Sequence, residues 1–387
     1  MDFTLSEDQR ILKDSIDRML CEHYDFERRK THTREPHGWS RALWERYAAM
    51  GLLAMPFAAA DGGVGGGAVE TLLVMEAFGR ALVLEPYLAT ILLGGGLVQF
   101  GGSPALRANL ISNICKGDLL LAFAQAESQS RYDLADVATS ARRDGRGWII
   151  DGQKRHVLHG DCAHKVIVSA RIEGNRRDPR GIGLFLVDTG SPGVSRRAYL
   201  LQDRLRGADV TFENVRIGAD CVIGDPGGAL PLMEKVVDLS VAALCAEAVG
   251  TMARAHEITV DYLKLRKQFG TSIGSFQALQ HRAVDMLVMI EQARSMAIYA
   301  AMMSEAEPAE RRRAVSAAKV QIGRSAKFVG AQAIQLHGGI GMTEECQVGH
   351  FYRRLTMIDL MFGDTRHHLG LLATTPEERG ISSGASP

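Results

Sequence analysis

Hydrophobic residues recur every three or four positions through most of residues 1–118, a spacing that predicts helices. The first helix follows Ser6, a candidate N-cap, and Gln9 stands three residues later as the partner in a capping box. Glycine-rich and proline-containing stretches separate the apolar helices that follow. Residues 1–118 are therefore predicted to form an N-terminal all-α domain.

The hydrophobic pattern changes near Leu119. Short runs rich in Val, Ile and Phe now alternate with polar residues and are bounded by Gly, Asp and Pro, as in antiparallel strands. The stretch RRDGRGW carries the signature of a hairpin turn. We expect residues 119–227 to form a small antiparallel β barrel or sandwich.

Helical spacing returns after residue 228. It predicts one long helix from Pro231 to Arg266 and three more at 276–304, 309–336 and 347–372. Long helices with short joints indicate an antiparallel four-helix bundle over 228–374, and the polar tail at 375–387 is predicted to be disordered. The expected fold class is α+β, in the order helical domain, β domain, helical bundle.

The composition is that of a soluble globular protein, with 46% hydrophobic and 23% charged residues. Lys+Arg and Asp+Glu balance at 45 each, so nothing indicates a nucleic-acid partner or a membrane surface. The acidic start and the absence of an apolar run of about 20 residues predict a cytoplasmic protein. The six cysteines are widely spaced without a CxxC pair, so we expect reduced thiols and no metal site.

Two motifs carry the chemistry. The first is RKQFGTSIGSFQ at 266–277, where a guanidinium at the end of a long helix can pair with a phosphate. The second is QAIQLHGGIGMTEE at 332–345, where paired glycines let backbone N–H groups approach a pyrophosphate. Each motif alone is weak, since the first could be an ordinary loop and the second a helix C-terminus.

Together, in this order and within an α–β–α chain, the two motifs resemble the acyl-CoA dehydrogenase family over nearly the whole sequence. The resemblance implies FAD as cofactor, removal of two hydrogens across Cα–Cβ of an acyl-CoA thioester, and electron-transfer flavoprotein as acceptor. Stretches such as EAFGRALVLEPYLAT and SRYDLADVAT are similar, within the family, to small subunits of pimeloyl-CoA dehydrogenases. That similarity implies a medium-chain or dicarboxylyl substrate.

The resemblance also assigns cofactor residues. The residues expected to reach across a subunit interface to the ADP half of FAD are Arg266, Phe269, Gln277, Gln335, Leu336, Gly338 and Gly339. Weaker candidates for the chain's own flavin are Glu127, Ser130, His156 and Val157. This half departs from the family: the usual Gly-Ser pair is missing after Glu127, and His156-Val157-Leu158 replaces Trp-Ile-Thr.

The catalytic base is the largest departure. The family places a Glu either just before a Gly in the last bundle helix or 26 residues before the Arg of the first motif. Counting puts Phe362 and Ser240 at these two positions, and neither can act as a general base. Asp364, two residues beyond Phe362, is the weak substitute, so the catalytic residue stays unknown.

Four functions remain open from the sequence. The main hypothesis is a subunit that completes the FAD site of a larger acyl-CoA dehydrogenase subunit in a heterotetramer. A self-sufficient homo-oligomer using Asp364, a flavin monooxygenase on the same fold and a cofactor-free structural subunit are the alternatives.

Overall fold

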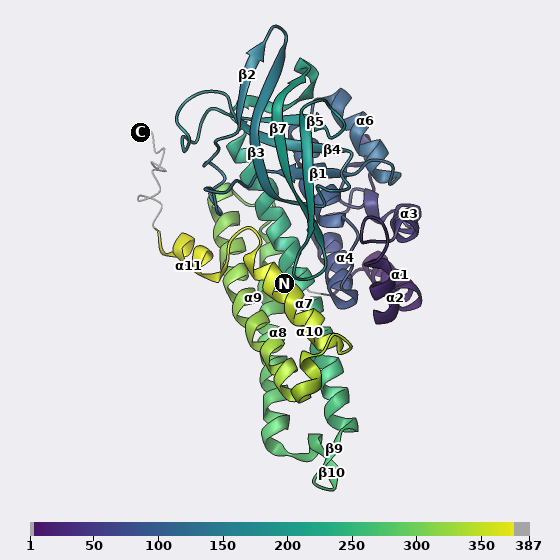
Figure 1. Cartoon of the computed structure of the whole chain (residues 1–387). Coiled ribbons are helices and arrows are strands. Elements are labelled where there is room, and N and C mark those ends of the chain that lie inside the picture. Colours follow the sequence, from purple (N-terminus) through teal and green to yellow (C-terminus); the bar gives the residue numbers. More distant parts are fainter. Residues whose placement is uncertain (1–3, 375–387) are drawn as a thin grey trace. The chain divides into compact units, whose positions relative to one another are not determined.

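The computed structural model describes residues 4–374, so the tail predicted to be disordered lies outside the described residues. The chain divides into two compact units, with the division inside one long helix between Ser240 and Val241. The short stretch Phe78–Arg80 belongs with the second unit. Figure 1 shows the helices and strands of both units.

The first unit begins with the predicted helices. Ser6 and Gln9 form the predicted capping box of the first helix, which is confirmed by reciprocal bonds of 3.2 and 3.0 Å. An eight-residue π-helix at Leu88–Gly95 was not predicted, because its i to i+5 bonding leaves no mark in the apolar spacing. The α-helices of this part are α1 (Glu7–His23), α2 (Phe26–His32), α3 (Arg41–Ala49), α4 (Ala68–Ala81), α5 (Gly96–Gly101) and α6 (Pro104–Cys115).

The β domain is a mixed eight-stranded sheet. Its strands are β1 (Leu121–Ala124), β2 (Ser140–Asp144), β3 (Gly147–Leu158), β4 (Lys165–Arg171), β5 (Ile182–Asp188), β6 (Val194–Leu200), β7 (Arg206–Ile217) and β8 (Val222–Gly227). They run in the order β6-β7-β3-β2-β4-β5-β8, and β1 pairs with β4. The predicted hairpin is β2–β3, closed at Asp144 and Gly147.

Two pairings contradict the expectation of a purely antiparallel domain, and in one of them β2 pairs with β4 in parallel at Ser140 and Arg171. Strands β1 and β4 run parallel, since the β2–β3 hairpin between them returns the chain to the same end of the sheet. The core under the sheet is aromatic and aliphatic: Trp148 meets Phe185 edge-on at 5.1 Å, and both are buried with Phe212 and Val157. This core lies on one face of the sheet, and the central strands β4 and β5 are buried on their other face as well.

The second unit is the helical bundle. Its helices are α7 (Leu230–Leu265, which enters it after Ser240), α8 (Gln277–Met302), α9 (Pro308–His337), α10 (Gln347–Leu360) and α11 (Thr365–Ala373), and a small hairpin β9 (Lys267–Gln268) and β10 (Thr271–Ser272) joins α7 to α8. Within residues 4–374, α7 alone is long and apolar enough to cross a membrane, but 89% of its apolar window is buried, as in the core helix of a soluble protein.

The prediction of one continuous last helix at 347–372 is wrong. The chain leaves helical geometry after Leu360 and restarts at Thr365, forming α10 and α11. Phe362 and Gly363 lie in the break with φ of 56° and 118°. The apolar spacing continued across the break, which is why the pattern concealed it.

Candidate functional site

The first motif forms an exposed hairpin at the end of α7. The Arg266 N–H donates to the carbonyl of Tyr262 at 2.8 Å, and the Arg266 carbonyl accepts from Ile273 N–H at 2.8 Å. Phe269 and Gly270 form the hairpin tip in left-handed conformation, with φ of 52° and 81°. Phe269 is 92% exposed, and its ring meets Phe276 edge-on at 6.2 Å.

Gln277 begins α8 and is exposed, so the motif's guanidinium, aromatic ring and amide all face solvent. Phe269 and the exposed Phe276 form an aromatic pair at this hairpin, and adjoining exposed apolar side chains are typical of contact surfaces. The predicted loop is thus present, but Gly270 sits at the hairpin turn, whereas the helix ends five residues earlier.

The second motif ends α9. Gly338 follows His337 with φ of 68°, and a Cβ added at Gly338 or Gly339 would meet nothing within 4 Å. The backbone of both glycines is therefore open to an approaching ligand. Gln335 is exposed, whereas Leu336 is buried, so Leu336 can offer a ligand only its backbone.

A ring stack joins the two motifs. The imidazole of His337 lies on the Tyr262 ring with centroids 4.4 Å apart, and the Tyr262 hydroxyl donates to the His337 carbonyl at 3.4 Å. Burial lowers the pKa of His337. Sequence reasoning missed this pair, although Tyr262 stands one turn before Arg266 and His337 directly precedes the glycines.

The break at Phe362 is held by a buried lysine. The Lys319 ammonium, on α9, donates to the carbonyl oxygens of Asp359 at 2.8 Å, Met361 at 3.0 Å and Gly363 at 2.7 Å. Burial lowers the pKa of Lys319 to about 8. Asp359 lies in the last turn of α10, whereas Met361 and Gly363 lie in the break that follows, so Lys319 caps α10 and holds the break together. Nothing in the apolar spacing around Lys319 indicates this role.

Asp364 serves as the N-cap of α11. Its carboxylate accepts the His367 N–H at 2.8 Å, which is an ordinary capping bond. Burial lowers the pKa of His368 to about 3, and its Nδ1 contacts the Ser316 hydroxyl at 3.1 Å. Asp364 is the candidate base closest to Phe362 in the sequence. Its carboxylate is thus already engaged in capping α11.

The second family position offers no base either. Ser240 is 1% exposed, and its hydroxyl has no hydrogen-bond partner among residues 4–374. Two turns further along α7, Glu247 is buried and forms a two-pronged ion pair with Arg354, with N–O distances of 2.5 and 2.8 Å. A carboxylate held by both oxygens in this way links α7 to α10.

Glu127 is part of an internal ion pair. Its carboxylate lies 2.7 Å from the Lys154 ammonium and also accepts the N–H groups of Ala138 and Thr139 at 2.9 and 3.1 Å. Burial alone would raise the pKa of Glu127, but Lys154 and these donors outweigh it and lower the pKa to about 2. The Ser130 hydroxyl likewise bonds the Glu127 backbone. The side chains of both residues are therefore engaged in bonds within the chain.

His156 and Val157 lie at an irregularity of β3, where the register against β7 shifts between Lys154 and Val157. Val157 is buried in the sheet core. His156 is exposed with φ of 53°, and its Nδ1 contacts the Tyr199 hydroxyl at 3.1 Å.

Tyr199 also donates to Asp209 at 3.3 Å, and Asp209 pairs with Arg155 and, at 2.9 Å, with Arg197. The side chains of His156, Tyr199, Asp209 and Arg155 thus form one connected polar network, in which Nε of Arg155 has no hydrogen-bond partner within residues 4–374. Beside it lies a surface depression of about 380 Å³, lined by Gln153, Arg155, Ser195, Arg196, Arg197, Asp209 and Thr211.

The sequence and the architecture match known proteins. Three acyl-CoA dehydrogenase family models match in order: the N-terminal domain at 6–118, the middle domain at 122–215 and the C-terminal domain at 230–375. The chain belongs to the acyl-CoA dehydrogenase family, whose members are oxidoreductases that act on CH–CH groups with a flavin.

Among similar proteins is the probable acyl-CoA dehydrogenase YngJ of Bacillus subtilis, 27% identical over 370 residues, which cover 93% of this chain and 95% of YngJ. The solved Tcur3481–Tcur3483 steroid ACAD is 26% identical with a TM-score of 0.87, covering 98% of this chain and all of that one. The FAD complex of PigA is 25% identical with a TM-score of 0.89, covering 98% and 100%.

Proposed function

We propose that this chain is the subunit of an FAD-dependent acyl-CoA dehydrogenase that completes the cofactor site of an unlike, catalytic subunit. The complex would desaturate Cα–Cβ of a medium-chain or dicarboxylyl acyl-CoA. In this assignment the chain provides binding surface for the ADP half of FAD, and the partner provides the flavin pocket and the catalytic Glu.

The observation that carries the proposal is the turn at Phe362. The residue at the family's base position is a phenylalanine in a left-handed turn, and Lys319 holds that turn through three carbonyls. The nearby Asp364 is used as a helix cap. Proton abstraction needs a carboxylate within hydrogen-bond reach of Cα, and this segment offers none that is uncommitted.

The end of the bundle suits the ADP half of FAD. Arg266 is exposed and can pair with a phosphate, Phe269 offers a bare ring, and Gly338 and Gly339 leave their backbone open. The Tyr262–His337 stack holds these groups at one end of the same unit. FAD, once bound, supplies hydride acceptance, and the residues of this chain bind and orient its nucleotide part.

The β-domain face suits a flavin poorly. His156 and Arg155 are joined to Tyr199 and Asp209, so their polar groups face one another. Leu158 stands where the family offers a hydroxyl and has no side-chain donor. The family's flavin-facing residues are thus altered in the β domain, whereas the residues for the ADP half of FAD are retained in the bundle. This difference supports a site shared between unlike chains.

One comparison favours an unlike partner. The Tcur3481–Tcur3483 steroid ACAD, similar over 98% of this chain, carries two component names. The dicarboxylyl substrate class is proposed from the resemblance of the sequence to small subunits of pimeloyl-CoA dehydrogenases. Electron-transfer flavoprotein is the proposed electron acceptor, and the cytoplasm the proposed location.

The test is to purify the chain alone and co-expressed with a candidate large acyl-CoA dehydrogenase subunit, sought first among the products of neighbouring genes. We expect flavin absorption and dehydrogenase activity from the pair only. Arg266→Ala should lower the FAD affinity of the pair at least tenfold, while the exposed Lys264→Ala should not. Full activity of the isolated chain would overturn the proposal in favour of a homo-oligomer. A complex of the two chains without flavin absorption and without activity would favour a structural subunit. A panel of monocarboxylyl and dicarboxylyl acyl-CoAs then defines the substrate.

A further inference from the structure

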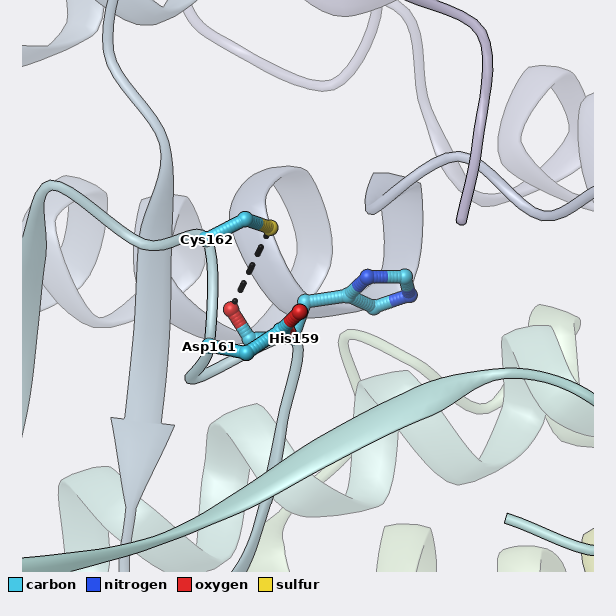
Figure 2. Close-up of side chains that lie close together, drawn as sticks. All are labelled: His159, Asp161 and Cys162. Atoms are coloured by element: carbon cyan, nitrogen blue, oxygen red, sulfur yellow. Dashed lines mark hydrogen bonds between the residues drawn. The ribbon is translucent and has the colours of Figure 1, made fainter. Parts of the chain in front are cut away.

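A loop between β3 and β4 gathers three side chains that can bind a metal. The imidazole of His159, the carboxylate of Asp161 and the thiol of Cys162 place one ligand atom each within 4.8 Å of one another. Figure 2 shows them on a single turn, with the Cys162 sulfur bonded to the His159 carbonyl at 3.4 Å. His159 adopts a left-handed conformation with φ of 50°, which is uncommon outside glycine and recurs at functional loops.

The carboxylate of Asp161 has one oxygen without a partner. The side chain is 4% exposed, and its Oδ2 pairs with Arg206 at 3.2 Å. Its Oδ1 is buried and makes no hydrogen bond within residues 4–374. An unsatisfied carboxylate oxygen in this setting costs free energy unless a proton donor or a cation completes it.

We propose that His159, Asp161 and Cys162 form a binding site for a divalent transition metal, with Zn²⁺ as the best fit. Imidazole, carboxylate and thiolate are the three ligand types that zinc takes, and a water molecule completes a tetrahedron. The site lies outside the proposed cofactor surface and uses none of its residues. It revises the expectation of no metal site, which rested on cysteine spacing alone.

The loop is held in place before any metal arrives. One guanidinium nitrogen of Arg196 donates to the carbonyls of Gly160 at 3.1 Å, Asp161 at 2.9 Å and Ala163 at 3.1 Å. Arg206 donates to Oδ2 of Asp161 at 3.2 Å, which restrains the carboxylate that also carries the unpartnered Oδ1. Such second contacts orient metal ligands and restrain their rotation.

The ligand atoms need only a small contraction. Atoms bound to one tetrahedral zinc at 2.0–2.3 Å lie about 3.3–3.8 Å apart, so a separation of up to 4.8 Å closes by side-chain rotation of about 1 Å. Cys162 must also exchange its proton for the metal. Binding therefore releases the thiol proton to solvent as the sulfur–metal bond forms.

The experiment uses the full chain, stripped of metal with a chelator and titrated with Co²⁺ as a spectroscopic stand-in for Zn²⁺. We expect one equivalent to bind and to produce the thiolate-to-cobalt charge-transfer band together with tetrahedral d–d bands. Zn²⁺ should displace the cobalt and abolish these bands. Cys162→Ser should remove the charge-transfer band and lower the affinity at least tenfold, and Asp161→Asn should lower it to a similar extent.

Cys221→Ser is the matched control. Cys221 is a free cysteine of the same β domain and does not belong to the His159, Asp161 and Cys162 cluster. It should leave both the band and the affinity unchanged. Far-UV circular dichroism and the melting temperature confirm that each variant is folded. No binding by the wild-type chain, or cobalt binding that survives Cys162→Ser unchanged, would overturn the proposal.

Discussion

The imidazole of His337 stacks on the phenol of Tyr262, with ring centroids 4.4 Å apart and planes inclined by 23°. Tyr262 precedes Arg266 by one helical turn, and His337 immediately precedes Gly338. The stack therefore couples the two motifs through residues that lie 75 positions apart in the chain. Since an aromatic pair contributes about 0.5–1.5 kcal/mol beyond its buried area, it can fix the relative position of the two ligand-binding segments.

Replacing Tyr262 by Ala should loosen this end of the bundle. We expect FAD affinity of the reconstituted pair to fall roughly five- to tenfold, as 1.4 kcal/mol corresponds to a factor of ten. Tyr262→Phe is the control, because it keeps the stack and loses only the long bond to the His337 carbonyl. Fluorescence titration with FAD gives both affinities. Equal affinity in Tyr262→Ala and wild type would show that the stack plays no part in binding.

Gly363 should tolerate no side chain. It has φ of 118°, and a Cβ there would lie 2.5 Å from the His367 ring and 2.6 Å from the His368 ring. Gly363→Ala is therefore expected to lower the free energy of unfolding by about 3 kcal/mol, from strain and collision together. Gly370→Ala, where a Cβ meets nothing within 4 Å on α11, should instead raise it by about 0.5–1 kcal/mol.

Urea unfolding followed by circular dichroism measures both glycine variants. A neutral Gly363→Ala would mean that the turn after Phe362 adopts a different conformation in solution.

Lys319 is expected to be worth more to the fold than a surface lysine. Lys319→Met leaves the carbonyls of Asp359, Met361 and Gly363 without their donor, and each buried unsatisfied group costs about 1–3 kcal/mol. Part of this cost is recovered by water, so we expect a loss of about 2–4 kcal/mol in unfolding free energy. Lys327→Met, at an exposed position of the same helix, should change it by less than about 0.5 kcal/mol. Equal effects of the two substitutions would contradict the capping role.

The sequence predicted more of the fold than of the site. Apolar spacing and one capping box identified the helices and most strands, because burial imposes those periods directly. Spacing failed at Phe362, where a break preserves the apolar pattern, and at β1, whose partner is chosen by topology. The capping role of Lys319 depends on contacts between distant segments, and the cluster at His159–Cys162 depends on loop geometry. Neither leaves a hydrophobic period in the sequence from which it could be predicted.

Asp364 can be a helix cap only, or the catalytic base, and the isosteric substitution Asp364→Asn distinguishes the two roles. Asparagine caps a helix about as well as aspartate, so Asp364→Asn should leave both stability and the activity of the reconstituted pair unchanged. Asp364→Ala should cost about 1 kcal/mol of stability through the lost cap and leave turnover intact. A fall in turnover of a hundredfold or more in Asp364→Asn, at unchanged stability, would make Asp364 the base and would overturn the shared-site proposal.

Glu127 should make the stability of the chain depend on acid pH. Its pKa is near 2 in the folded chain against an ordinary value of 4.5, because Lys154 and backbone donors favour the carboxylate. A folded pKa below the unfolded one gives stability that is complete above about pH 4.5 and is lost as the pH falls through about 2. At 1.36 kcal/mol per unit the contribution is roughly 3 kcal/mol.

The measurement compares urea midpoints between pH 5 and pH 2 for wild type, Glu127→Gln and the exposed control Glu213→Gln. Glu127→Gln should be less stable at pH 5 and should lose less stability on acidification, whereas Glu213→Gln should follow wild type throughout. Parallel pH profiles for all three proteins would show that the carboxylate of Glu127 is not held in its charged form by Lys154.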